Sequence, residues 1–301
     1  MKVRIGIVTY NRREVLEKAI QSALAQTYEP KEIVVADDAS TDGTSSLAEK
    51  YPQVKWIMNS ERKGCIRARN ELMMLAGADA YCSLDDDSWF LDSDALAQAV
   101  ARLQTDSTIG AIAFTIQDAA TQGTAIAGDV AWFVGCGHLV QLKPVRETGG
   151  YGAFPGEYGC EEKDLSIRLI DQGYRIERMA DIAVWHDKTF EARDVPRLHA
   201  SGVCNDLAFD FLRCPLPLLF FYFPKKVIGH LAFAIKYSLK ETRSLSAWDA
   251  SVRNTWGRAV FFRPYLQGIG MFLKESRRLL TLRNPVSTAA YRSFRTKAAL
   301  S

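Results

Sequence analysis

Short apolar runs alternate with amphipathic segments over the first third of the chain. Strands are predicted at the apolar runs 3–9, 32–36, 55–58 and 80–84. Helices are predicted between them, at 12–25, in a segment ending at residue 50, and at 66–76. Alternating strands and helices are typical of a parallel sheet whose faces are covered by crossover helices. This part of the chain therefore predicts an α/β fold.

The pattern becomes mixed in the rest of the chain. Further elements are predicted as strands at 111–116, 130–134 and 182–185, a helix at 161–172, and a glycine-rich stretch over 135–159. From about residue 209, aromatic clusters and prolines alternate with Lys and Arg. We expect a mixed, mostly parallel sheet flanked by helices, built from two halves of one domain at 1–105 and 106–208. A helical C-terminal region at 209–301 would follow it.

Charge is divided unevenly between this C-terminal region and the rest. Residues 213–301 carry 16 basic and 3 acidic side chains, whereas residues 1–212 carry 22 and 32. Such asymmetry is typical of a segment that meets an anionic surface. Two interpretations stay open: a helical cap with a solvated basic face, or peripheral docking on the anionic inner leaflet of the plasma membrane. Nucleic acid is not an expected partner, because no recognisable nucleic-acid module accompanies the basic residues.

Hydropathy and cysteine spacing predict the compartment. The longest uncharged stretch, 214–224, is about half as long as a helix that spans a bilayer, so no transmembrane helix is predicted. The six cysteines show no CxxC spacing, and the first residues show no signal-peptide pattern. A reducing, cytoplasmic location is therefore expected.

Polar side chains follow three of the predicted strands. They are Thr9, Tyr10 and Asn11 after the first, Asp37 and Asp38 after the second, and Asp85, Asp86 and Asp87 after the fourth. Ligands of parallel sheets gather at the carboxyl ends of the strands. Adjacent carboxylates repel one another unless a cation offsets their charge, and their oxygens suit Mg²⁺ or Mn²⁺. A metal site is therefore predicted at this edge, with a solvated turn or routine helix caps as the alternative.

Six further residues are candidates for a site. They are Arg69, Gly135, Cys136, Gly137, Glu161 and Glu162, and a seventh, His186, follows an apolar run. The arginine belongs to a basic cluster that either is a solvated face or neutralises a diphosphate. The two glycines leave room for backbone amides to approach a phosphate or a sugar. A carboxylate at a helix start is favoured by the macrodipole, yet a well-placed one also suffices as a general base. A lone histidine after a strand is more often a buried structural residue.

Together these features resemble the family-2 inverting glycosyltransferases with the GT-A fold. The matching segments keep their order over residues 3–190 and are Val8–Arg12, Gln26–Tyr28, Glu32–Asp42, Gly64–Asn70, Leu84–Asp87 and Glu161–Leu169. The resemblance implies a nucleotide-diphosphate sugar as donor and a divalent metal, Mg²⁺ or Mn²⁺, as cofactor. UDP-sugars are favoured over dTDP-sugars. A glycan or lipid-linked acceptor is implied, in the synthesis of bacterial surface polysaccharide or glycolipid.

The resemblance also implies roles for particular residues. The nucleotide would be contacted by Thr9, Tyr10, Asn11, Asp38 or Asp37, Arg69, Asp85 and Asp86. The metal would be bound by Asp87, by Asp85 and by His186, with Asp87 the direct ligand of the triplet and Asp86 the least needed. The sugars would lie near Gly135, Cys136 and Gly137. Glu162 would be the general base, with Glu161 as its rival, because the second acid of the family's ED pair is a glutamate here.

Two other classes of function remain as alternatives. An aspartate-dependent phosphatase also uses a DxD motif after a strand, but it places its nucleophile after the first strand, where this chain has Thr9 and Tyr10. A catalytically silent protein that binds membrane surfaces would need none of Asp38, Asp85, Asp87 and Glu162.

Overall fold

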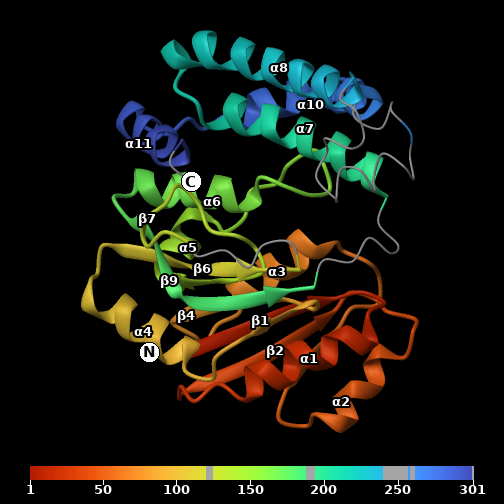
Figure 1. Ribbon diagram of the computed structural model, residues 1–301, viewed down its shortest axis with the longest axis vertical. Coiled ribbons are helices and arrows are strands. Elements are labelled where there is room, and N and C mark those ends of the chain that lie inside the picture. Colours follow the sequence, from red (N-terminus) through yellow and green to blue (C-terminus); the bar gives the residue numbers. More distant parts are fainter. Residues whose placement is uncertain (120–124, 188–193, 240–256, 258–261, 300–301) are drawn as a thin grey trace. The chain divides into compact units, whose positions relative to one another are not determined.

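The computed structural model describes residues 1–119, 125–187, 194–239, 257 and 262–299 (Figure 1). Its strands are β1 (Val3–Thr9), β2 (Lys31–Asp37), β3 (Lys55–Met58), β4 (Ala80–Asp85), β5 (Ser88–Phe90), β6 (Ile109–Gln117), β7 (Gly128–Asp129), β8 (His138–Gln141) and β9 (Arg175–His186). Its helices begin with α1 (Arg13–Leu24), η1 (Thr44–Ser46), α2 (Leu47–Lys50), α3 (Cys65–Met74), α4 (Ala95–Thr105), α5 (Leu142–Thr148) and α6 (Glu161–Asp171). They end with α7 (Val195–Arg213), α8 (Leu216–Leu239), α10 (Phe262–Leu282) and α11 (Thr288–Ala298).

Contacts divide the chain into two compact units. Unit 1 comprises Met1–Gly152, Leu165–Thr189 and Arg292–Ser301. Unit 2 comprises Ala153–Asp164 and Phe190–Tyr291. Unit 1 therefore holds the sheet, and unit 2 holds α7, α8 and α10.

The sheet of unit 1 has the strand order β3-β2-β1-β4-β8-β6-β9-β5, with β7 paired to β9. The first four strands of this order, β3, β2, β1 and β4, are parallel, whereas β8 is antiparallel to both of its neighbours. Every residue of β1 is buried, because helices cover both faces of the sheet. On one face α1 and α4 supply apolar side chains to the core, and on the other face α3, α5 and α6 do so. The predicted mixed, mostly parallel α/β sheet is confirmed.

Several predicted elements of the second half need correction. The strand predicted at 130–134 is absent: pairing with β9 is limited to Gly128 and Asp129, and the chain then turns through a single bridge from Val134 to Gly137. The short strand predicted at 182–185 is the end of a 12-residue strand, β9. Its first half is only partly buried and carries charges, so an apolar run did not reveal it. Strands β5 and β8 and helices α4 and α5 were not predicted.

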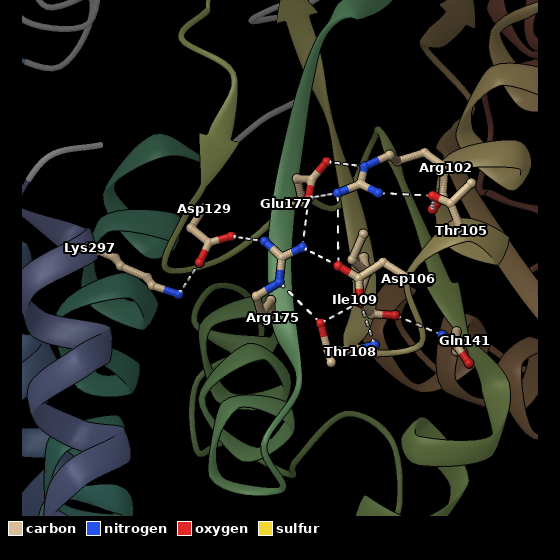
Figure 2. A network of polar contacts seen from close by, with 10 residues as sticks. All are labelled: Arg102, Thr105, Asp106, Thr108, Ile109, Asp129, Gln141, Arg175, Glu177 and Lys297. Carbon is tan, nitrogen blue, oxygen red and sulfur yellow. Dashed lines mark hydrogen bonds and ion pairs between the residues drawn. The ribbon is translucent and has the colours of Figure 1, made fainter.

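A polar network binds the outer elements of unit 1 together (Figure 2). Arg175 of β9 donates to Asp129 of β7 at 2.6 Å, and Lys297 of α11 donates to the same carboxylate at 3.0 Å. Glu177, two residues further along β9, accepts from Arg102 of α4 at 2.6 and 2.8 Å. The network therefore joins β7, β9, α4 and the end of α11.

Unit 2 is built from long helices. Helix α7 packs along α10, where a Cβ on Gly268 would lie 2.6 Å from the Ala200 carbonyl oxygen, so only glycine allows this close approach. Among the described residues, α8 is the one helix long and apolar enough to cross a membrane by length and composition alone. The sequence did not predict this helix as a membrane span, because the uncharged stretch ends at residue 224 and the helix continues through Lys225 and Lys226. No disulfide joins the six cysteines, all of which lie in the described part of the chain.

Candidate active site

The three strand ends singled out in the sequence meet in the sheet of unit 1. Thr9 at the end of β1 is in register with Asp37 of β2, and the preceding residue, Val8, is in register with Asp85 of β4. The Asp38 amide donates to the Thr9 carbonyl oxygen at 2.9 Å. Because neighbouring parallel strands end together, side chains separated by about 30 and 75 positions in the chain face one edge of the sheet. The predicted location of the site therefore has a structural basis.

Asp86 and Asp87 are almost completely buried, and both accept from Arg12 at the start of α1. The guanidinium lies 3.0 Å from Asp86 Oδ1 and 2.8 Å from Asp87 Oδ2. The Thr9 hydroxyl donates to Asp86 Oδ2 at 2.9 Å. Sequence reasoning expected a metal ion to offset the triplet and did not single out Arg12. The structure shows that a cationic side chain of the protein already shares this task.

Burial and neighbouring charges separate the two carboxyls by pKa. Burial, with the charges of Asp87 and Asp85, raises the pKa of Asp86 to about 7 against the opposing effect of Arg12. Burial also acts to raise the pKa of Asp87, but His186 and Arg12 outweigh it and hold this pKa below its usual value. Asp87 is therefore the carboxylate that stays ionised near neutral pH, as a metal ligand must.

His186 reaches the triplet because β9 pairs with β5. His186 is in register with Ser88, and the Asp187 amide donates to the Asp87 carbonyl oxygen at 2.8 Å. Its Nε2 lies 3.3 Å from Asp87 Oδ1, and its Nδ1 lies 3.6 Å from Cys136 Sγ. One imidazole thus bridges the last aspartate and the cysteine.

Asp85, Cys136 and His186 could together hold a metal ion, since one ligand atom of each lies within 4.8 Å of the others. Carboxylate and imidazole suit Mn²⁺, whereas a thiol is a softer ligand that this ion does not require. Asp85 also pairs with the buried guanidinium of Arg69 in α3. The backbone amide of Asp85 donates to the Ser88 hydroxyl at 2.7 Å. The donor set therefore fits a divalent cation through its oxygen and nitrogen atoms.

Asp37 and Asp38 form hydrogen bonds that hold the loops after β2. Asp37 accepts from the Ser40 amide at 2.9 Å, which closes a turn. Asp38 accepts from the amides of Lys63 at 2.9 Å and Gly64 at 2.8 Å, and so holds the loop that leads into α3. Both carboxylates therefore shape the loops at this strand end.

Asn11 and Tyr10 follow β1 and face two different environments. Asn11 adopts a φ of 52°, and its side-chain oxygen accepts from the Thr41 amide at 2.7 Å, so it joins the turns after β1 and β2. The Tyr10 ring is exposed, and the Arg62 guanidinium lies 4.3 Å from its centroid. An exposed ring beside a cation is a suitable surface for stacking a nucleobase.

The glycine-rich turn after residue 134 is closely packed. A Cβ on Gly137 would lie 2.6 Å from Ile116 Cδ1, so this glycine is required by packing. Gly135, Cys136 and Gly137 are all buried. Nearby, burial lowers the pKa of His138 to about 3, and its Nδ1 lies 2.8 Å from the Val134 carbonyl oxygen. His138 is therefore a neutral structural histidine. Of Gly135, Cys136 and Gly137, only Cys136 lies among potential metal ligands.

The candidate bases Glu161 and Glu162 lie in the first turn of α6 and belong to unit 2. Glu161 is buried, whereas Glu162 is partly exposed. Cys160 before them adopts a φ of 75°, which is uncommon for a residue other than glycine. Asp164, one turn along α6, is fully buried and accepts from Arg213 Nε at 2.5 Å. The first turn of α6 is thus fixed, with Glu162 the more accessible carboxylate.

The loop before this turn is held by a residue that sequence reasoning missed. Asn205 of α7 is fully buried, and its side-chain oxygen accepts from the Gly156 amide at 2.7 Å. Its amide nitrogen donates to the carbonyl oxygens of Gly156, Tyr158 and Gly159 at 2.9 to 3.2 Å. An asparagine within a helix carries no local signal of such a role, because its partners lie more than forty positions away.

The chain is similar to several known proteins. Residues 4–130 match the model of the family described as Glycosyl transferase family 2. An Escherichia coli relative, UDP-Glc:alpha-D-GlcNAc-diphosphoundecaprenol beta-1,3-glucosyltransferase WfaP, is 34% identical over 91 residues, which are 30% of this chain and 36% of that protein. The glucosyl-dolichyl phosphate glucuronosyltransferase of Haloferax volcanii is 25% identical over 224 residues, 64% of this chain and 71% of that one.

A solved structure shows the same fold. The mannosyltransferase PcManGT from Pyrobaculum calidifontis, in complex with GDP-Man and Mn²⁺, superimposes with a TM-score of 0.56 at 20% identity. The similarity covers 99% of this chain and 86% of that one. Residues 4–130 therefore match Glycosyl transferase family 2, and the chain has a GT-A-like fold.

Proposed function

We propose that the enzyme transfers a sugar from a nucleotide-diphosphate donor to the hydroxyl of a glycan or lipid-linked acceptor, with inversion at the anomeric carbon. A UDP-sugar is the favoured donor and a dTDP-sugar the alternative. The setting is the synthesis of bacterial surface polysaccharide or glycolipid. The observation that carries the proposal is the meeting of Thr9, Asp37 and Asp85–Asp87 at adjacent strand ends, with His186 beside them. A relative named for UDP-Glc and a diphosphoundecaprenol acceptor supports the choice of substrates.

Two parts of the strand edge divide the recognition of the donor. The exposed Tyr10 ring stacks on the nucleobase, and Asp37 or Asp38 accepts from the base or the ribose. Arg69 and Arg12 lie beside the aspartates and offset the negative charge of the diphosphate. The pairing of each arginine with an aspartate keeps it in place before the donor binds.

A divalent ion, Mg²⁺ or Mn²⁺, would be held by Asp87, Asp85 and His186. It would stabilise the charge that develops on the leaving diphosphate. Asp87 suits this role because its pKa is held below the usual value by His186 and Arg12 even though it is buried. His186 would bind the ion through its Nε2 atom, while its Nδ1 atom keeps the contact with Cys136.

Glu162 is the proposed general base. It takes the proton of the acceptor hydroxyl while the new glycosidic bond forms and the bond between the anomeric carbon and the diphosphate oxygen breaks. Its greater exposure favours it over Glu161, whose side chain is buried in the first turn of α6. A carboxylate that faces solvent is able to meet an acceptor, whereas a buried one first has to move.

The test compares Glu162→Gln with Glu161→Gln as the matched control. Thermal-shift titrations with UDP, dTDP and GDP and their sugars, each with Mn²⁺, identify the donor in the unmodified enzyme. Transfer is then measured with that donor. We expect Glu162→Gln to lower kcat by about a thousandfold or more with unchanged nucleotide affinity, and Glu161→Gln to lower it less. Near-normal turnover of Glu162→Gln would rule out Glu162 as the base, and no shift with any nucleotide would refute the donor class.

A further inference from the structure

Helix α8 presents apolar side chains to its surroundings along one face. They are spaced three and four residues apart and form a continuous row, here called the α8 stripe: Phe221, Pro224, Ile228, Ala232, Ile235 and Leu239. All are exposed, Ile228 by 63% and Leu239 by 76%. Of the 24 residues of the helix, Ala234 is the one that is buried. In water a helix ordinarily turns such a stripe toward the protein core.

Two polar side chains of α8, Lys226 and His230, point the other way, toward α7. Lys226 Nζ lies 3.1 Å from Asp206 Oδ1 and 3.0 Å from Asp210 Oδ2. His230 Nε2 lies 3.0 Å from Asp206 Oδ2. Phe223, on the same side, packs among the apolar residues of α7 and α10. These contacts within unit 2 fix the rotation of α8 about its axis, so the stripe is held outward.

Cationic side chains border the stripe. Lys225 and Lys236 are exposed at its edge, and Lys225 Nζ lies 3.5 Å from the centroid of the Phe221 ring. The neighbouring helix α10, whose Tyr265 donates to the Val227 carbonyl oxygen at 3.3 Å, adds more exposed apolar and basic residues. They are Leu266, Leu273, Leu280, Arg263, Lys274, Arg277 and Arg278. A partner that matches both features is apolar inside and anionic at its surface.

We propose that α8 lies flat in the interface of a membrane rich in anionic phospholipids. The α8 stripe enters the acyl region, while Lys225 and Lys236 extend to the phosphate groups. This arrangement places the enzyme on the cytoplasmic leaflet, which is the anionic side of the plasma membrane. The inference does not depend on the proposed donor or acceptor, and it selects membrane docking over a solvated cap for the basic region.

The ion pairs of α8 favour lying in the interface over crossing the bilayer. Lys225, Lys226 and His230 lie near the middle of the helix, where a crossing helix is farthest from water. Crossing would either separate Lys226 from Asp206 and Asp210 or carry both carboxylates of α7 into the hydrocarbon. Either change exposes an ion to a medium that does not solvate it.

The test is co-sedimentation of the full chain with phosphatidylcholine vesicles, with and without phosphatidylglycerol, at low and high salt. We expect binding to the anionic vesicles that weakens with salt. Ile228→Glu should lower the bound fraction by about tenfold or more, because it places a charge in the acyl region. The matched control is Ile126→Glu, the same change at an exposed isoleucine of unit 1, which should bind as the unmodified chain does. Lys225→Gln combined with Lys236→Gln should reduce the preference for anionic lipid.

Four results would overturn the inference. Equal binding of Ile228→Glu and the unmodified chain would exclude the stripe. Binding that is independent of phosphatidylglycerol would exclude the role of the lysines. A membrane fraction that resists alkaline carbonate would show that α8 crosses the bilayer. A dimer in solution that Ile228→Glu converts to a monomer, with no vesicle binding, would show that a second copy covers the stripe. Nucleotide affinity, measured alongside, tests the proposed function separately.

Discussion

Arg12 occupies the position that connects α1 to the acidic triplet. Its guanidinium contacts both Asp86 and Asp87, while Thr9 donates to the other oxygen of Asp86. Asp86 is therefore enclosed by protein donors, whereas Asp87 shares its carboxylate between Arg12 and His186. The two adjacent aspartates therefore differ in their partners. Asp86 joins the residues after β4 to Thr9 and Arg12, whereas Asp87 contacts His186.

Substitution of the two aspartates by asparagine should separate these tasks. Asp87→Asn removes the carboxylate that stays ionised and should lower transfer by about a hundredfold or more. Asp86→Asn should lower it by less than about tenfold, because burial raises the pKa of Asp86 to about 7 and an amide resembles the protonated acid. The measurement is transfer activity against Mn²⁺ concentration. Equal losses in the two variants would contradict this assignment. A higher Mn²⁺ concentration for half-maximal activity in Asp87→Asn alone would support it.

At the scale of elements, Arg4 joins β1, β2 and α3. It is buried in β1 and in register with Glu32 of β2, whose carboxylate accepts from Arg4 Nε at 2.8 Å. The same guanidinium donates to the carbonyl oxygens of Leu72, Leu75 and Ala76, where α3 ends, at 2.7 to 3.0 Å. One arginine thus satisfies the last carbonyls of a helix and pairs two strands of the sheet.

Glu32→Gln should lower the free energy of unfolding by about 2 kcal/mol at neutral pH, because it leaves a buried guanidinium without its counter-charge. Burial acts to raise the pKa of Glu32, but hydrogen bonds from Lys55, Lys2 and Arg4 outweigh it and lower this pKa to about 2. The depressed pKa means that ionised Glu32 stabilises the fold above about pH 4.5. That contribution is lost as the pH falls toward 2.

Urea unfolding between pH 7 and pH 3 measures this difference. The gap between the unmodified chain and Glu32→Gln should narrow as the pH falls. Glu29→Gln is the matched control, since Glu29 is an exposed glutamate just before β2 that pairs with Lys31. It should change stability by less than about 0.5 kcal/mol at every pH. A gap that stays constant with pH would show that Glu32 acts through shape and not through charge.

At the scale of the whole molecule, the candidate site residues are divided between the two units. The strand-end residues lie in unit 1, whereas Glu161, Glu162 and Asn205 lie in unit 2. The family match at residues 4–130 lies wholly in unit 1. The proposed base and the residue that holds its loop therefore lie outside the matched segment.

Asn205→Ala should loosen the loop before Glu161 without touching the donor site. It removes the buried amide that bonds Gly156, Tyr158 and Gly159, so the proposed base is no longer held in place. We expect kcat to fall by about ten- to a hundredfold with unchanged nucleotide affinity, as found when a supporting contact is lost. Ser201→Ala, one turn earlier on α7, removes only a contact with the Glu157 amide at 3.3 Å and serves as the control. Loss of nucleotide affinity in Asn205→Ala would instead indicate general unfolding.

The sequence by itself determined the parallel half of the sheet and the place of the site. Strands β1, β2 and β4 are short apolar runs buried on both faces, and each is followed at once by its polar residues, so local pattern was sufficient. The tertiary structure decided which residues meet those strand ends. Arg12 pairs with aspartates 74 and 75 positions away, and His186 reaches them only because β9 pairs with β5. It also decided which face of α8 is exposed, since the contacts of Lys226, His230 and Phe223 with the neighbouring helices orient the helix. Contacts between distant segments follow from strand pairing and helix packing, and they leave no periodic signal in the local sequence.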